Sequence, residues 1–261
     1  MHLVIDIGNS NVVIALNRDE VWTHIFRYET KDDQPALYYQ NGIANLLFEW
    51  GVHAENINQI TISSVVPHLN EKITAAIVNA TGITPLLLGP AQLRNLDFSI
   101  PHVNEIGTDL VANAYGAVLK WAKPCIIVDF GTALTFTVAH PKEGILGVTI
   151  APGIKTALAS LSDQTAQLPF VTLEVPPSAI GKSTQHAIQA GVLIGYEGLV
   201  LHLLERIKSE LSETYLTIAT GGISETIQFI SRHFDHTAKN LTIDGILALG
   251  KALGSKPSTD S

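Results

Sequence analysis

The sequence predicts an α/β protein built from two domains of similar topology, and two observations carry this prediction. First, the segments "LVIDIGNSNVVI" and "CIIVDFGTALTF" both read as an apolar strand, an Asp-x-Gly turn and a second strand, with Asp6 and Asp129 at matching positions. Second, predicted strands followed by helices run through the chain twice, which is typical of a pair of α/β domains.

The first half of the chain supplies the elements of one predicted domain. The strands predicted there are 2–8, 11–16, 21–30, 59–66 and 84–89, and the helices are 42–51 and 69–82. Gly82 is expected as the left-handed residue that ends the second helix. An alanine-rich helix at 107–123 then joins the two domains, which we expect to span 1–116 and 117–255.

The second half repeats the pattern. Its predicted elements are a hairpin at 125–140, a strand at 215–222, helices at 224–234 and 243–254, and a disordered tail at 256–261. Residues 187–204 are apolar enough to resemble a membrane span, but Gln189, Glu197 and His202 interrupt them. We therefore expect a packed helix there, whose small residues make it a candidate for a domain or subunit interface.

Composition narrows the function classes. The 261 residues are 46% hydrophobic and 15% charged, which predicts a globular protein with well-buried cores. The net charge is −8 and the sequence has no run of lysines or arginines, so it lacks the electrostatic footprint of a nucleic-acid-binding protein. The single cysteine, Cys125, excludes an internal disulfide, and no secretory signal is visible, so we expect a cytoplasmic protein.

The Asp-x-Gly turns have a chemistry that suits a nucleotide. Glycine lets the backbone approach phosphate oxygens closely, and the carboxylate can hold a hydrated cation beside them. One such turn alone is usually an ordinary hairpin. Two matched copies, together with the turn Thr220-Gly221-Gly222 after a late strand, favour a nucleotide-binding cleft between two related domains.

These motifs, in this order, resemble the type III pantothenate kinases of the acetate and sugar kinase, Hsp70 and actin superfamily. Eight segments carry the resemblance: "DIGNSN", "SSVVP", "EIGTDLVANAYGA", "DFGTALTF", "LGVTIAPG", "TAQLP", "IGKSTQHAIQAG" and "ATGG". The resemblance implies two ribonuclease H-like domains with a nucleotide cleft between them: an actin-like domain at 1–116 and a second at 117–255 that carries a dimer interface.

The resemblance also implies an activity, ATP-dependent phosphorylation of pantothenate as the first step of coenzyme A biosynthesis, by a cytoplasmic homodimer. The implied ATP-binding residues are Asp6, Ile7, Gly8, Asn9, Ser10, Asn11, Val12, Val13 and Thr132. Asp6 would also help place Mg²⁺, and Asp129 aligns with the residue that binds a monovalent cation, K⁺ or NH₄⁺. Neither a nucleic acid nor a membrane is an expected partner.

Asp109 aligns with the general base of the family. Taken alone, an acid at a helix start is equally explained as a stabiliser of the helix dipole. Within the whole pattern, a carboxylate beside the acceptor hydroxyl suits phosphoryl transfer, which requires the hydroxyl proton to be accepted late in the reaction. The implied acceptor-binding residues are Ile100, Gly107, Thr108, Asp109, Leu110 and Thr184.

The acceptor pocket is also where the sequence departs from the family pattern. Leu110 replaces the arginine expected to hold the pantothenate carboxylate, and Ile100 replaces a tyrosine. Three explanations are open. Another cation, His102, Arg94 or Lys155, supplies the contact; the acceptor is a different small alcohol; or the protein is a non-catalytic nucleotide-binding accessory or regulatory protein.

Overall fold

A computed structural model describes residues 1–31, 33–163, 169, 171–222 and 228–254 of the chain. These form two compact units. Unit 1 comprises Met1–Ala122, Pro141–Ile145 and Asn240–Ser261, and unit 2 comprises Lys123–His140 and Leu146–Lys239. The predicted disordered tail at 256–261 and most of the "TAQLP" motif lie outside the described residues.

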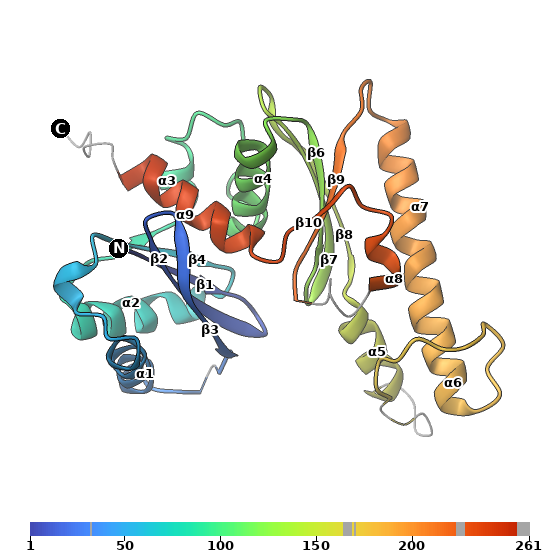
Figure 1. Cartoon of the computed structure of the whole chain (residues 1–261), viewed down its shortest axis with the longest axis horizontal. Helices are drawn as coiled ribbons and strands as arrows, with labels where there is room; N and C mark the ends of the chain where they lie inside the picture. The colour runs from blue at the N-terminus through green and yellow to red at the C-terminus, as the bar shows by residue number, and fades with distance from the viewer. Residues whose placement is uncertain (32, 164–168, 170, 223–227, 255–261) are drawn as a thin grey trace. The chain divides into compact units, whose positions relative to one another are not determined.

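Unit 1 is a mixed sheet with helices on both faces (Figure 1). Its strands are β1 (His2–Ile7), β2 (Asn11–Arg18), β3 (Val21–Glu29), β4 (Gln59–Ser64) and β5 (Leu86–Leu87), and its helices include α1 (Ala36–Glu49), α2 (Pro67–Thr81), α3 (Pro90–Leu93), α4 (Thr108–Trp121) and α9 (Leu241–Gly254). A short 3₁₀ helix spans Ala54–Asn56. Among the described residues the strand order is β3-β2-β1-β4-β5, with β1 antiparallel to β2 and parallel to β4.

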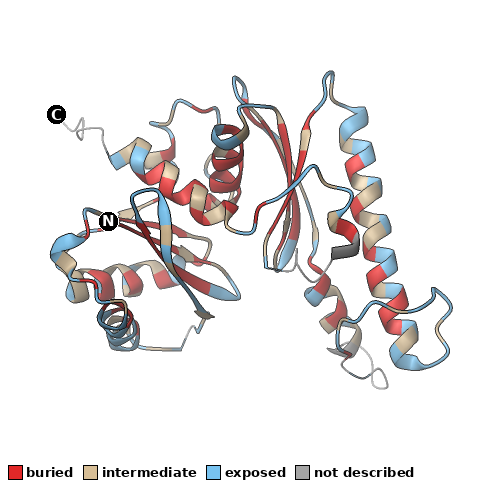
Figure 2. Ribbon diagram, in the orientation of Figure 1, coloured by how far each residue is buried: buried red, intermediate tan, exposed pale blue. Residues whose placement is uncertain are grey.

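Successive side chains of β1 point to opposite faces of the sheet, so its odd and even positions pack against different helices. Leu3, Ile5 and Ile7 are fully buried in the core that α1 and α2 cover. His2 and Asp6 therefore lie on the opposite face, where α9 contacts β1 and β4. Figure 2 shows the buried residues along these central strands.

Unit 2 repeats the same order of strands. Its elements are β6 (Cys125–Phe130), β7 (Ala133–His140), β8 (Gly144–Pro152), α5 (Ile154–Asp163), α6 (Thr184–Gln189), a π-helical segment (Ala190–Ile194), α7 (Gly195–Ser209), β9 (Leu216–Thr220), α8 (Gln228–Ser231) and β10 (His236–Thr237). The described strands are ordered β10-β9-β6-β7-β8, with β6 antiparallel to β7 and parallel to β9. The predicted duplication of topology is thus confirmed.

The core of unit 2 follows the same rule of alternation. Ile126, Val128 and Phe130 of β6 pack in one cluster with the buried face of α7, which includes Tyr196 and Val200. Asp129 consequently lies on the opposite face of the sheet, as Asp6 does in unit 1.

Helix α9 belongs to unit 1, although it ends the described chain. A Cβ atom added at Gly116 of α4 would lie 2.9 Å from the Cα atom of Gly245, and one added at Gly245 would lie 1.9 Å from the carbonyl oxygen of Ala112. Two facing glycines therefore let α4 and α9 touch backbone to backbone. The division expected from the sequence, 1–116 and 117–255, differs from the two units in the placement of α9 and in the boundary, which falls after Ala122.

Candidate active site

In unit 1, the first Asp-x-Gly turn stands at the carboxyl edge of two parallel strands. Asp6 pairs with Ser63 in the register of β1 and β4. The N–H group of Val65 donates to the carbonyl oxygen of Ile7 at 3.0 Å, which continues the pairing past the strand end. Ligand sites of open α/β sheets lie at such carboxyl edges, so this edge is the natural place for a site.

The start of helix α4 is fastened to the same edge. The hydroxyls of Thr108 and Ser63 are 2.9 Å apart, and the Thr108 hydroxyl also donates to the carbonyl oxygen of Ser64 at 3.2 Å. Thr108 is buried, as this role requires. The hydrogen bonds bring three predicted motifs together within unit 1: "DIGNSN", "SSVVP" and "GTDL".

Asp109 follows directly after this anchor. Its carboxylate accepts a hydrogen bond from the N–H group of Leu110 at 2.8 Å. Desolvation by burial raises the pKa of Asp109, and backbone hydrogen bonds oppose that rise in part. Gly107 makes room for the side chain, since a Cβ atom at this position would lie 2.3 Å from Asp109 Oδ1. The result is a desolvated carboxylate that is a stronger base than an ordinary aspartate.

The predicted ATP-binding residues of the first loop divide by burial. Asn9, Ser10 and Asn11 are exposed, whereas Ile7, Val12 and Val13 have buried side chains. The three apolar residues can therefore offer a ligand only backbone atoms. The N–H group of Gly8 donates to the carbonyl oxygen of Asn11 at 2.9 Å and closes the turn.

In unit 2, the second Asp-x-Gly turn lies beside the "ATGG" turn. Asp129 pairs with Thr220 in the parallel register of β6 and β9. Gly221 has a φ of +96°, and a Cβ atom there would lie 2.5 Å from Asp129 Oδ1 and 2.7 Å from the Phe130 carbonyl oxygen. Only glycine satisfies both the backbone conformation and the close approach. The Asp129 carboxylate and the Phe130 carbonyl oxygen therefore both lie close to Gly221.

Thr132 stands in the same turn and is contacted by the segment after β8. Its carbonyl oxygen accepts from the Gly153 N–H group at 3.0 Å and from the Thr156 hydroxyl at 2.8 Å. The "DFGT", "ATGG" and "APG" motifs are therefore brought together within unit 2.

The predicted acceptor-binding residues do not all gather with Asp109. Leu110 is 8% exposed, so its side chain belongs to the core. Ile100 lines a cavity of about 340 Å³ together with Arg94 and Asp97. Arg94 Nη2 donates to Asn104 Oδ1 at 2.8 Å, which orients the guanidinium. His102 is exposed and has a φ of +50°.

Thr184 lies in unit 2, at the first residue of α6. Ser183 caps this helix by accepting from the His186 N–H group at 3.2 Å. Thr184 also lines an apolar groove of about 570 Å³ between α5 and the continuous helix Thr184–Ser209.

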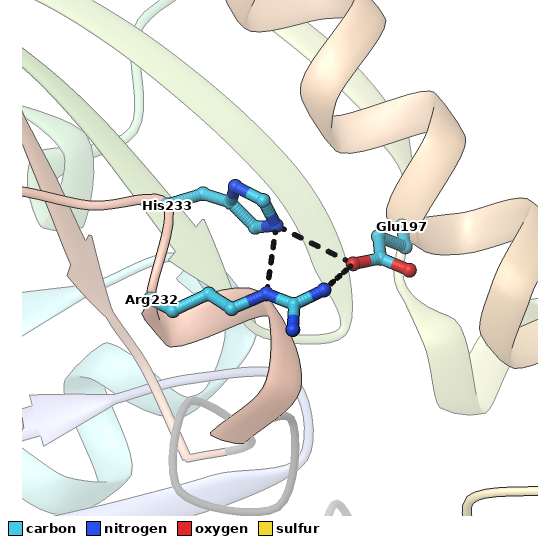
Figure 3. Close-up of polar contacts among 3 residues, drawn as sticks. All are labelled: Glu197, Arg232 and His233. Atoms are coloured by element: carbon cyan, nitrogen blue, oxygen red, sulfur yellow. Dashed lines mark hydrogen bonds and ion pairs between the residues drawn. The ribbon is translucent and has the colours of Figure 1, made fainter.

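The polar residues that follow helix α8, and the single cysteine, have structural roles. His233 and Arg232 of unit 2 both contact Glu197 at 3.4 Å and so tie the end of α8 to α7 (Figure 3). Asp235 accepts hydrogen bonds from the Thr217 N–H group and hydroxyl, each at 2.8 Å, which lowers its pKa. Cys125 is buried, and desolvation raises its pKa to about 12, as suits an unreactive thiol.

Sequence reasoning missed Thr30 and Thr156 as residues of the site, and it gave no role to Gly153, which ends the "LGVTIAPG" segment. Each contacts a turn from outside the Asp-x-Gly motif, through hydrogen bonds between segments about 20 residues apart. Each unit has a threonine shortly after its third strand, Thr30 after β3 and Thr156 after β8. This repetition can be recognised in the sequence only once the strand pairing is known.

Comparison with known proteins decides the family. The sequence model described as type III pantothenate kinase matches residues 2–206. The chain belongs to the type III pantothenate kinase family. The type III pantothenate kinase of Syntrophotalea carbinolica is 33% identical over 249 residues, covering 95% of this chain and 98% of that protein. That of Treponema pallidum (strain Nichols) is 39% identical over 228 residues, covering 85% and 84%.

Solved structures place this type III pantothenate kinase family member in its fold class. Component A of the (R)-2-hydroxyglutaryl-CoA dehydratase of Acidaminococcus fermentans is similar with a TM-score of 0.57 at 13% identity, covering 97% of this chain and 96% of that one. The activator of the 2-hydroxyisocaproyl-CoA dehydratase of Clostridium difficile, solved with bound ADPNP, gives 0.56 at 10% identity, covering 100% and 98%. These similarities and the repeated sheet topology confirm the predicted α/β fold of two domains with like topology.

Proposed function

We propose that this chain transfers the γ-phosphoryl group of ATP to the 4′-hydroxyl of pantothenate, the first step of coenzyme A biosynthesis. Family membership supports the reaction, and one observation in the structure carries it for this chain. The buried contact between Thr108 and Ser63 sets Asp109 at the same strand edge as the Asp6 turn. A base and a phosphate loop thus share one edge of one sheet.

Asp109 acts as the general base in this proposal. The acceptor oxygen forms a bond to the γ-phosphorus, the bond from that phosphorus to the β,γ-bridging oxygen breaks, and ADP leaves. The hydroxyl proton goes to the Asp109 carboxylate, whose raised pKa favours accepting it. We expect Asp109→Asn to lower kcat by about a hundredfold or more and to leave ATP binding intact. Full activity in this variant would refute the mechanism.

The two turns hold the nucleotide in this proposal. Residues 6–13 bind the phosphates mainly through backbone N–H groups, and Thr132 also contacts ATP. The single carboxylate of Asp6 suits Mg²⁺, which keeps most of its waters and takes other oxygens from the phosphates. The oxygens gathered around Asp129 and Phe130 are the hard donors that K⁺ or NH₄⁺ takes. These cations would neutralise the charge that builds on the transferred group.

For the acceptor carboxylate, the cavity at Ile100 favours Arg94 as the replacement for the absent arginine. Arg94 lines this cavity, and Asn104 orients its guanidinium. His102, another of the three cations that the sequence offers for this contact, does not line the cavity. The test compares pantothenate with pantothenol, which carries a hydroxymethyl group in place of the carboxylate. Arg94→Met should raise the KM for pantothenate about tenfold or more and leave that for pantothenol unchanged.

One observation favours a second candidate function, a kinase for a different small alcohol. Leu110 is buried where the family arginine is expected, so the altered position offers no polar group to a ligand. If Arg94→Met affects pantothenate and pantothenol equally, the acceptor carries no carboxylate in this cavity, and other alcohols become the substrates to screen.

We also propose that the protein works as a homodimer in the cytoplasm through the groove beside Thr184. Ile194 is exposed on that helix, and a Cβ atom added at Gly191, Gly195 or Gly198 meets nothing within 4 Å. The chain itself does not need these glycines, whereas a closely packed second copy would. Replacing Gly195 with Trp should leave the protomer folded and convert dimer to monomer in analytical ultracentrifugation.

The helix that carries this groove is also long and apolar enough to span a membrane, judged by length and composition alone. Its buried residues argue for a packed helix instead, because Leu193, Tyr196, Val200 and Leu204 belong to the core of unit 2. A protein that sediments as a dimer without detergent would support the packed helix, and one that requires detergent would contradict it.

A further inference from the structure

Both Asp-x-Gly turns are held from outside by a threonine that the sequence motifs do not include. In unit 1 this residue is Thr30, which follows the last residue of β3. Its N–H group donates to the carbonyl oxygen of Ser10 at 3.0 Å, and its hydroxyl donates to the carbonyl oxygen of Gly8 at 2.6 Å. One residue thereby fixes both sides of the turn.

Unit 2 has an equivalent arrangement at the end of its own third strand. Gly153 follows β8 and donates its N–H group to the carbonyl oxygen of Thr132 at 3.0 Å. The hydroxyl of Thr156, in the first turn of α5, donates to the same oxygen at 2.8 Å. In both units a backbone N–H group and a threonine hydroxyl are thus used together on carbonyl oxygens of the turn.

The planarity of the peptide bond gives these contacts a directional consequence. In a trans peptide, the carbonyl of one residue and the N–H group of the next point in opposite directions. Holding the carbonyls of Gly8 and Ser10 against Thr30 therefore turns the N–H groups of Asn9 and Asn11 away from Thr30. Holding the carbonyl of Thr132 does the same for the N–H group of Ala133. Fixed N–H groups of this kind are what a phosphate-binding turn needs.

We propose that Thr30 and Thr156 are positioning residues for the phosphates of ATP, each fixing the N–H groups of one turn through its carbonyls. This inference rests on the proposed function in one respect, namely that the chain binds ATP. It does not depend on which alcohol accepts the phosphoryl group.

A purely structural role is the alternative, and the chain offers matched controls for it. The hydroxyl of Thr23, also at β3, donates to the carbonyl oxygen of Leu16 at 3.2 Å, far along the strand from the turn. The hydroxyl of Ser160, in α5, donates to the carbonyl oxygen of Ala157 at 2.8 Å. Removing these hydroxyls takes away the same kind of hydrogen bond without touching either turn.

The experiment measures the affinity of the purified chain for ATP and for adenosine by calorimetry. Thr30→Val keeps the shape and the N–H group but removes the hydroxyl. We expect it to weaken ATP binding about five- to tenfold, the effect of one hydrogen bond, and to leave adenosine binding unchanged. Thr30→Ser should restore wild-type affinity, and Thr23→Val should change neither ligand. Equal loss for ATP and adenosine, or no loss, would overturn the role of Thr30.

Thr156→Val, with Ser160→Ala as its control, tests the second turn in the same way and decides the matter if Thr30→Val does not fold. A selective loss of ATP affinity supports the inference. Unchanged ratios of ATP to adenosine affinity in the folded variants refute it. If the wild-type chain binds no ATP at all, the proposed function fails first, so the two failures are distinguishable.

Discussion

The two Asp-x-Gly hairpins share one plan but hold their turns differently. In unit 1, three residues separate β1 from β2, and Thr30 supplies both donors to the turn. In unit 2, two residues separate β6 from β7, and the donors come from Gly153 and Thr156. Gly153 approaches so closely that a Cβ atom would lie 2.3 Å from the Gly131 carbonyl oxygen, which leaves no space for a threonine there.

A second difference lies in what stands beside each turn. At the carboxyl edge of the unit 1 sheet, the start of α4 with Asp109 lies beside the turn. At the corresponding edge of unit 2, the turn at Gly221 lies there instead. The duplicated hairpin therefore supplies two similar turns, and a different neighbouring element stands beside each of them. In our proposal one edge provides a base, and the other provides oxygens for a monovalent cation.

The largest expected effect comes from replacing, one at a time, the two aspartates that distinguish the sheet edges of unit 1 and unit 2. Asp109→Asn should lower kcat by about 10²- to 10⁴-fold, the usual contribution of a general base, with unchanged affinity for ATP. Asp129→Asn should lower activity less and abolish its dependence on potassium. Steady-state kinetics with K⁺ or Na⁺ measures both. Identical kinetic defects in the two variants would show that the edges do not differ in role.

A smaller effect should follow from filling the space at Gly153. The added methyl of Gly153→Ala meets the carbonyl oxygens of Gly131 and Thr132 within 2.4 Å, so the turn of unit 2 must shift. We expect a loss of about 1–3 kcal/mol in stability and a raised KM for ATP. Gly147→Ala, in strand β8 that precedes Gly153, is the control, because its Cβ atom meets nothing within 4 Å. Equal behaviour of the two alanine variants in thermal melts and kinetics would contradict this account of the turn.

The first residues of β1 and β6 also differ, and this difference should make the stability of the protein depend on acidic pH. His2 is buried against Thr61, and desolvation, assisted by Lys251 and the N-terminal charge, lowers its pKa to about 4. The corresponding residue of unit 2 is Cys125, which stays neutral in acid. Stability from a neutral buried histidine is fully present above pH 6.5 and is lost toward pH 4, by up to about 3 kcal/mol. His2→Gln should remove much of this acid sensitivity in chemical denaturation at pH 7 and pH 4. Equal sensitivity in both proteins would exclude His2 as its source.

The smallest expected effect concerns the cost of keeping Asp109 ionised. Its raised pKa means that the charged form is less favourable in the folded state than in the unfolded chain. Asp109→Asn should therefore raise the melting temperature at pH 7, because the amide carries no charge to desolvate. The gain should shrink as the pH falls and vanish well below the ordinary aspartate pKa of 3.8, where the carboxyl is protonated in both states. A variant less stable than wild type at pH 7 would contradict the desolvation of Asp109.

The sequence predicted the elements whose signals are local. The hairpin at 125–140 was predicted from its apolar runs, and Gly82 from the end of a helical pattern; it is indeed left-handed, with a φ of 72°. Strand β8 was missed, because its residues alternate poorly in burial and Gly147 interrupts them. Helix α1 begins at Ala36, six residues before the predicted helix, because its first turn shows no helical alternation in sequence: Leu37 and Tyr38 are apolar or aromatic but exposed, and the adjacent Tyr39 is buried.

The sequence predicted those residues of the candidate site that stand in short local motifs. Asp6, Asp109 and Asp129 were predicted because each stands in a recognisable local pattern, and the structure places each at a strand edge or helix start. Thr30 and Thr156 contact turns that lie about 20 residues earlier in the sequence, and the cavity of Arg94 depends on the path of the single segment 93–103. Such contacts follow from strand register and loop path, which a single sequence does not specify.

The most direct test of the central claim is a turnover assay on the purified chain with ATP and Mg²⁺, with and without pantothenate, in K⁺ or in Na⁺. The account predicts ADP formation that requires pantothenate and falls when Na⁺ replaces K⁺. ATP binding without any stimulation by pantothenate would contradict the proposed reaction.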